Sequence, residues 1–178
     1  MSYPARITIP VAGAANLGLA ARMAVLLGLA AFVPSLGLPQ QVTGPLVNAL
    51  LFLSVGSVGA SNAILVGGVP SMVGIAQGTL PLPLVAMVPY IVAGNAVLVV
   101  TFALLRRRGF ALAAVAAAVL KFALLYCAVT YVVRLPQPVA TMMQLPQLYT
   151  ALAGAAIAFA AERGGTWARA LLRARLGW

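Results

Sequence analysis

The stretch AVAAAVLKFALLYCAVTYVV, residues 114–133, decides the class of fold. It is apolar at nearly every position, and a helix of about 20 such residues crosses a hydrocarbon layer of about 30 Å. The exception is Lys121, near its middle, which is the only lysine in the chain. A charged side chain at that depth is costly and needs a partner. The stretch therefore predicts a membrane-spanning helix that carries a polar group with a specific role.

The composition of the whole chain agrees with this prediction. Of 178 residues, 63% are hydrophobic and 7% are charged, whereas soluble domains are about a quarter charged. Backbone groups in a bilayer must be paired internally, and no segment alternates with a period of two, so the spans are expected to be helices rather than barrel strands. The sequence predicts an all-α integral membrane protein. Four single crossings are expected at residues 17–38, 84–105, 109–134 and 145–162.

Residues 44–75 are harder to assign, because they are long for one crossing and short for two. The break GSVGAS in their middle favours two short spans joined by a tight turn. The total is then six transmembrane helices in one compact bundle, residues 1–162. With six spans, nine of the ten arginines fall on one side and only Arg134 on the other. The excess of arginine on one side predicts that both termini are cytoplasmic, in a multi-pass protein of the cell membrane.

The net charge of +10 does not require a nucleic-acid ligand. The arginines lie next to the predicted spans on one side, where the anionic headgroups of the lipid bilayer attract them. Residues 163–178 are expected to form a basic interfacial tail. It contains TWARALLRARLGW, which separates Arg169 and Arg173 from Trp167, Leu171 and Trp178 as on the two faces of a short amphipathic helix. We expect this helix to begin after a break at Gly164 and Gly165. A cytoplasmic partner docking on the tail is the alternative.

The missing residue types exclude most catalytic chemistry. The chain has no histidine, one acid, Glu162, and one cysteine, Cys127. Paired carboxylates, Ser-His-Asp and Cys-His arrangements and His-based metal sites are therefore impossible within this sequence. A phosphate-binding loop of the G-x-x-x-x-G-K-[ST] type is also absent. We expect no enzyme activity, no cofactor and no metal site.

Strongly polar residues inside the predicted spans suggest a binding site. Asn48, Asn62 and Asn95 lie on three neighbouring helices, and Lys121 lies on a fourth. Because amide and charged groups are costly in hydrocarbon, we expect these side chains to face inward and to meet one another or a ligand. The alternative for the lysine is that its flexible stem carries the ammonium toward the headgroups. A buried lysine can also lose its proton, so both charge states stay open.

The exterior loops are expected to cover this site. They span about 38–44, 76–83 and 135–146, are rich in Gln, Thr and Pro, and contain no acid. They suit a pre-shaped lid over a neutral or anionic molecule, although plain connecting loops would look similar. We expect Gln77 and Gln144 to contact the solute from these loops, and Tyr126 and Tyr131 to form aromatic sides above Lys121.

The first predicted span carries a stripe of small residues, because Ala20, Ala24 and Gly28 fall four apart on one helix face. Small side chains let membrane helices approach closely, so the stripe is a packing face. It packs either within the bundle or against a second membrane protein.

Together these features resemble the substrate-binding S component of energy-coupling factor (ECF) vitamin transporters. The likeness rests on six short helices in under 200 residues, the A-x-x-x-A pattern, the proline-bearing loops and the basic face. Within residues 17–162, GPLVNALLFLSVGSVGASNAILVGG, GTLPLPLVAMVPYIVAGNAVLV and LKFALLY are similar to an uncharacterised branch of these proteins. The resemblance implies that a vitamin or related micronutrient binds under the three exterior loops. Metal-binding members use an amino-terminal histidine, which this chain lacks.

The resemblance also implies partners. Ala20 and Ala24, extended by Gly28, match the face that docks on a transmembrane coupling protein driven by two cytoplasmic ATPases. With one cation, several amides and no buried acid, we expect the solute to be a small heterocycle with a carbonyl, a carboxylate or a ring nitrogen. Two other classes stay open: an accessory or assembly subunit of a membrane complex that transports nothing itself, and a passive channel for small solutes.

Overall fold

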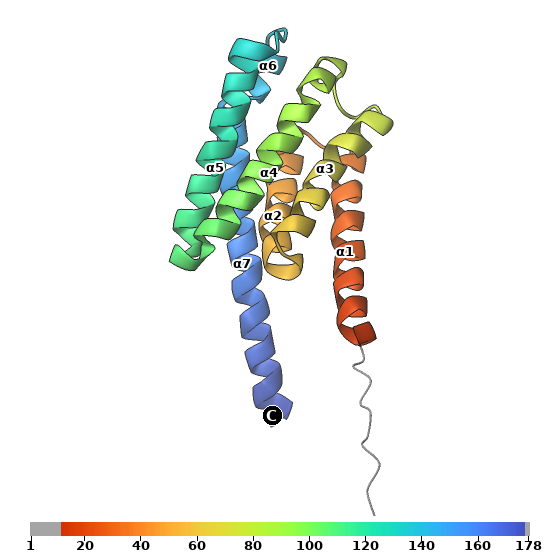
Figure 1. Cartoon of the computed structure of the whole chain (residues 1–178), viewed down its shortest axis with the longest axis vertical. Helices are drawn as coiled ribbons and strands as arrows, with labels where there is room; N and C mark the ends of the chain where they lie inside the picture. Colours follow the sequence, from red (N-terminus) through yellow and green to blue (C-terminus); the bar gives the residue numbers. More distant parts are fainter. Residues whose placement is uncertain (1–11, 177–178) are drawn as a thin grey trace, which may run out of the picture.

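The computed structural model describes residues 12–176, and the side chains of residues 17–166 within them. This part of the chain is helical, without strands (Figure 1). The α-helices are α1 (Ala12–Ser35), α2 (Gln40–Val58), α3 (Ala60–Ala76), α4 (Val88–Leu105), α5 (Phe110–Cys127), α6 (Val139–Met142) and α7 (Leu145–Leu176). Three helical segments of other types adjoin them, namely the 3-10 turns η1 (Leu82–Met87) and η2 (Arg106–Arg108) and the π-helical turn η3 (Ala128–Val132).

The helices have the apolar character that the composition predicts. Four helical segments in the described residues are long and apolar enough to cross a membrane, namely Leu17–Ser35, Gln40–Val58, Leu82–Arg108 and Phe110–Val132. The helix Ala60–Ala76 is apolar but shorter. The chain is therefore a helical protein that suits a membrane environment, as predicted.

Residues 44–75 form parts of two helices, as the break in the sequence predicts. The turn is at Gly59, between α2 and α3, where φ is +82°. Glycine adopts this conformation without the steric cost that a side chain would bring. The helix α2 begins at Gln40 rather than at 44, so most of the predicted loop 38–44 is its first turn. Pro39 occupies the position before the first helical residue. Proline has no backbone N–H, and at this position no N–H is needed for a hydrogen bond within the helix.

The predicted break at Gly164 and Gly165 is wrong. The helix α7 continues through both glycines to Leu176, and neither has a positive φ. Glycine in a helix costs only about 1 kcal/mol relative to alanine, which the neighbouring helix-forming residues offset. The boundary between residues 1–162 and the tail thus lies inside one helix, which extends beyond the bundle in Figure 1. The predicted roles of Arg6 and of the side chains at 167–178 lie outside the described residues.

The ends of the described chain lie at the same end of the bundle. Figure 1 shows the first turn of α1, the turn between α2 and α3, and the turn between α4 and α5 at the end where α7 leaves the bundle. The turn between α4 and α5 is η2, the run of three arginines. The helix α6 lies at the opposite end. We call these the arginine end and the α6 end.

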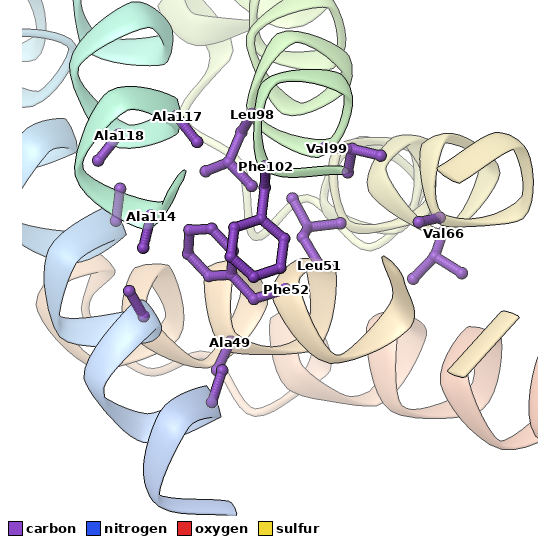
Figure 2. Packing of buried hydrophobic residues seen from close by; sticks show 14 of the residues in the cluster. Ala49, Leu51, Phe52, Val66, Leu98, Val99, Phe102, Ala114, Ala117 and Ala118 are labelled. Atoms are coloured by element: carbon purple, nitrogen blue, oxygen red, sulfur yellow. The ribbon is translucent and has the colours of Figure 1, made fainter. Parts of the chain in front are cut away.

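The bundle is packed around aromatic side chains from α2, α4 and α5. Phe52 and Phe102 are fully buried and meet edge to face, with ring centroids 4.8 Å apart. Phe110 meets Phe102 in a similar way at 5.1 Å. Alanines of α5, including Ala114 and Ala117, let the neighbouring helices approach this cluster closely (Figure 2). This core fixes α2, α4 and α5 relative to one another, and these helices carry the polar residues described next.

Candidate functional site

Lys121 is buried within the bundle and is bonded to two amides. Its side chain is 3% exposed, and its Nζ donates to Oδ1 of Asn48 and to Oδ1 of Asn95, each at 2.7 Å. The three residues come from α5, α2 and α4. The expectation that these polar groups face inward and meet is confirmed for this trio, which we call the lysine cluster. The alternative, in which the lysine stem reaches toward the headgroups, is wrong.

The two asparagines of the lysine cluster are held in place by their own donors. Asn48 Nδ2 donates to the carbonyl oxygen of Gly44 at 2.9 Å, one turn earlier in α2. Asn95 Nδ2 donates to the carbonyl oxygen of Gly67 on α3 at 2.8 Å. Because an amide has its donors on nitrogen and its acceptor on oxygen, these bonds turn both Oδ1 atoms toward the lysine. The ammonium therefore meets two acceptors that are already oriented.

Glycines let the helices approach closely enough to form the cluster. A Cβ added to Gly154 of α7 would lie 2.6 Å from Asn48 Cβ and 2.7 Å from the carbonyl oxygen of Pro45, closer than side chains allow. A Cβ on Gly67 of α3 would lie 3.2 Å from Asn95 Cβ. Both asparagines are thus placed by a neighbouring helix that presents backbone in place of a side chain.

The lysine cluster lies at one end of a cavity of about 430 Å³. The cavity extends from the lysine cluster toward the α6 end, and residues of all three predicted exterior loops line it. Hydroxyls and amides are mixed with apolar groups, and no acid or aromatic side chain takes part. The lining residues are Pro34, Gly37, Leu38, Pro39, Gln40, Thr43, Gly44, Val47, Asn48, Pro70, Ser71, Gly74, Thr79, Leu80, Pro81, Leu84, Ile91, Asn95, Lys121, Met142, Met143 and Gln147.

The segment over the cavity is tied to two helices. The carbonyl oxygen of Met142, at the end of α6, accepts from Gln147 Nε2 at 3.1 Å and from Gln40 Nε2 at 3.4 Å. Gln147 belongs to α7 and Gln40 to the first turn of α2. The two amides therefore tie the end of α6 to α2 and α7 at a point where it lines the cavity.

Both predicted aromatic contacts, from Tyr126 and Tyr131, are wrong. Tyr126 is 41% exposed and Tyr131 is 79% exposed, and neither lines the cavity. Tyr126 is five positions after Lys121, which places it about 140° around the helix from the lysine. Leu125, four positions after Lys121, takes the buried place instead. Tyr131 lies in the π-helical turn η3, which has more residues per turn than an α-helix, so its position does not follow the α-helical spacing from Lys121.

Three predicted polar contacts also lie outside the cavity. Asn62 is in the first turn of α3, toward the arginine end, and donates to the carbonyl oxygen of Val58 at 2.9 Å. Gln77 is exposed at the end of α3. Gln144 precedes α7, and its carbonyl oxygen accepts from the backbone N–H of Gln147 at 2.9 Å. A polar residue in a predicted span or loop therefore does not by itself indicate a side chain that lines the cavity.

Gln147 is one of the polar lining residues that sequence reasoning missed, together with Gln40, Thr43, Ser71 and Thr79. It is buried on the inner face of α7, in helical spacing with Ala151, Gly154 and Ala158. That spacing of small residues was available in the sequence and marks the face of α7 that packs against α2. Extending it back by one turn from Ala151 reaches Gln147.

The stripe of small residues on α1 faces away from the bundle. Ala20, Ala24 and Gly28 are exposed, and a Cβ on Gly28 would meet no atom within 4 Å. The helix packs inward through other positions, among them Leu26 and Ala30. The alternative in which the stripe packs within the bundle is therefore wrong for the described residues.

The cavity offers hydrogen-bond donors at its inner end. When Lys121 is protonated, its ammonium has three donors, and the two asparagines use two of them, so one remains for a solute. Each asparagine nitrogen has a second hydrogen beyond the one it gives to a carbonyl oxygen. The walls are mostly apolar. The arrangement can hold a small molecule with an acceptor group at one end and an apolar body.

Comparisons with protein-family models, with curated proteins and with solved structures found no match to this chain. The site is therefore interpreted from its own geometry. The resemblance to the S components stays a prediction.

Proposed function

We propose that this chain is the membrane-embedded solute-binding subunit of an ECF-type importer, which captures a vitamin or related micronutrient. The observation that carries the proposal is the lysine cluster at the inner end of a 430 Å³ cavity. A buried cation with a remaining donor, facing a cavity without any acid, suits a solute that carries a carbonyl, carboxylate or ring nitrogen. Cavities of this size are typical of small-molecule sites.

The proposal includes six transmembrane helices with both termini cytoplasmic, in the cell membrane. In this arrangement α3 and α7 cross the bilayer together with the four longer apolar segments. The common location of the start of α1, of η2 and of the outgoing part of α7 at the arginine end supports it. The cavity then opens on the exterior side, where the solute arrives.

The proposal also includes docking on a transmembrane coupling protein driven by two cytoplasmic ATPases. The exposed stripe of Ala20, Ala24 and Gly28 supports this part, because a flat face without packing partners in its own bundle suits contact with another membrane helix. Binding would occur in the isolated chain, whereas uptake would need the partners.

Native mass spectrometry of the detergent-purified chain tests the solute-binding role. A stoichiometric small molecule that copurifies would identify the solute and supply the probe for titration. Lys121→Met should then weaken binding at least about tenfold, as expected for loss of one charge-assisted hydrogen bond. Asn62→Ala, a polar change outside the cavity, should leave the affinity unchanged. Equal affinity in the wild type and in Lys121→Met would remove the lysine from the site.

One observation favours the accessory or assembly subunit as a second candidate. Within the described residues every buried side-chain nitrogen and oxygen has a hydrogen-bond partner, so the lysine cluster is satisfied without a solute. Bonds of this kind join membrane helices with about 1 kcal/mol each. This candidate predicts that no small molecule copurifies from cells grown in rich medium and that the chain is isolated together with membrane proteins.

A further inference from the structure

A second hollow, of about 730 Å³, lies toward the arginine end, away from the lysine cluster. It is formed where α1, α2, η2 and α7 approach one another. Its lining combines guanidinium groups with aliphatic side chains. The lining residues are Ala21, Arg22, Val25, Leu26, Leu53, Gly56, Ser57, Arg106, Glu162 and Thr166.

The charges in this hollow do not cancel. Arg106 is bonded to Glu162, with Nη2 and Oε1 2.7 Å apart. Glu162 is the only acidic side chain of the sequence, so no second acid is available for Arg22. Arg22 donates from Nη1 to the backbone carbonyl oxygen of Ser57 at 3.3 Å, which leaves the other donors of its guanidinium unused by that bond. The hollow therefore keeps a net positive charge.

The arginines are held beside each other by the backbone of α2. Nη1 of Arg106 lies over Gly56, where an added Cβ would come within 2.6 Å of it. Arg22 is bonded to the next residue, Ser57. Two guanidinium groups from α1 and η2 thus converge on one turn of α2. Guanidinium groups recognise phosphate oxygens through paired N–H donors.

The rest of the hollow is apolar on the side nearer the middle of the bundle. Val25 is 61% exposed and lies one turn beyond Arg22 on α1, and Leu53 lies one turn before Ser57 on α2. A soluble anion would contact the arginines and leave this aliphatic wall uncovered. An amphiphile with an anionic head would cover both parts, with its headgroup at the arginines and its chain along Val25 and Leu53.

We propose that this hollow binds one anionic phospholipid, with its phosphate between Arg22 and Arg106 and an acyl chain along α1. The proposal does not depend on the solute-binding role and concerns a different part of the molecule. Basic pockets between membrane helices bind such headgroups in general. Within such a pocket, each charge-assisted hydrogen bond from a guanidinium to the phosphate contributes about tenfold or more in affinity.

Native mass spectrometry with defined lipids tests this proposal. The full-length chain is purified in detergent, mixed with phosphatidylglycerol or phosphatidylcholine, and the retained lipid is counted. We expect selective retention of one phosphatidylglycerol. Arg22→Gln should lower its apparent affinity at least about tenfold, the loss expected for one charge-assisted hydrogen bond, while keeping the Arg106–Glu162 ion pair. Arg106→Gln should lower the affinity at least as much, and it also removes that ion pair.

Arg107→Gln is the matched control, because Arg107 lies next to Arg106 in the same turn, is exposed and does not line the hollow. Retention as in the wild type is expected for this variant, and thermal unfolding of every variant shows that the fold is kept. Equal retention of the two lipids would overturn the proposal, and a helix of a protein partner would then be the alternative occupant of the hollow. An equal loss in Arg107→Gln would overturn it in favour of general surface charge. Occupancy by added inorganic phosphate without phosphatidylglycerol would assign the hollow to a soluble anion.

Discussion

The lysine cluster predicts a specific energetic coupling between two helices. Lys121 on α5 and Asn95 on α4 are each 3% exposed, and their Nζ and Oδ1 atoms are 2.7 Å apart. A double-mutant cycle with Lys121→Met, Asn95→Leu and the combined variant isolates this contact from everything else that each change removes. Asn95→Leu also breaks the bond to Gly67, and the cycle subtracts that loss.

The expected coupling follows from the burial and from the charge. Hydrogen bonds to charged groups contribute about 1.5–3 kcal/mol in soluble proteins. Polar pairs between membrane helices average about 0.6 kcal/mol and reach about 1.7, because the unfolded helices in a membrane also find partners. The short distance and the burial of both groups place this pair near the upper part of the membrane range. We expect a coupling of about 1–1.7 kcal/mol.

Reversible unfolding in mixed micelles, followed by circular dichroism, measures the four free energies of unfolding. A second cycle combines Lys121→Met with Asn62→Leu and serves as the control, because Asn62 bonds to Val58 and shares no partner with the lysine. This control cycle should be additive within about 0.5 kcal/mol. A coupling for Asn95 no larger than that for Asn62 would refute the arrangement of the lysine cluster.

Two further predictions concern helix surfaces, one that is exposed on α1 and one where α7 packs closely against α2. Replacing both Ala20 and Ala24 by Trp should leave the free energy of unfolding within about 0.5 kcal/mol of the wild type, since both are exposed, and should preserve solute binding while abolishing uptake. As a control, Ala30→Trp, at a buried position of the same helix, should destabilise the fold. Uptake that survives the double change would mean that the stripe does not dock on a partner. Gly154→Ala should lower the free energy of unfolding by about 1–3 kcal/mol, because the new Cβ would lie within 2.8 Å of backbone atoms of α2. Gly164→Ala is the control, because open space surrounds Gly164, and it should raise the free energy of unfolding by up to about 1 kcal/mol. Thermal unfolding measures both variants, and equal effects at the two glycines would contradict the close packing of α2 and α7.

Much of the fold was predictable because hydrocarbon restricts the possible structures. Long apolar runs without period-two alternation leave the helix as the available conformation, and the glycines of GSVGAS mark the turn at Gly59. Helix ends were harder to predict. The break at Gly164 and Gly165 was expected from composition alone, but glycine ends a helix only where the chain needs a conformation that other residues avoid.

The candidate site was predictable in its centre and not at its rim. Lys121 and two asparagines, Asn48 and Asn95, were expected to meet because polar groups in a bilayer must find partners, and the structure brings them together. Asn62 satisfies the same requirement through a carbonyl oxygen of the preceding turn, so an asparagine in a span need not point to a site. The tyrosines were misplaced because aromatic side chains face lipid as readily as a cavity.

The location of the lysine cluster bears on the choice between solute binding and assembly. Replacing a buried polar network by well-packed apolar residues is often neutral or stabilising, so stability alone gives little reason to keep a lysine at this depth. A network that serves only to join helices can be placed anywhere along their contact. Here it borders a cavity of about 430 Å³, and a protonated Lys121 has a donor beyond the two that the asparagines accept. Both features suit a group that meets a solute, and they are the reason to look for a bound molecule before looking for a partner protein.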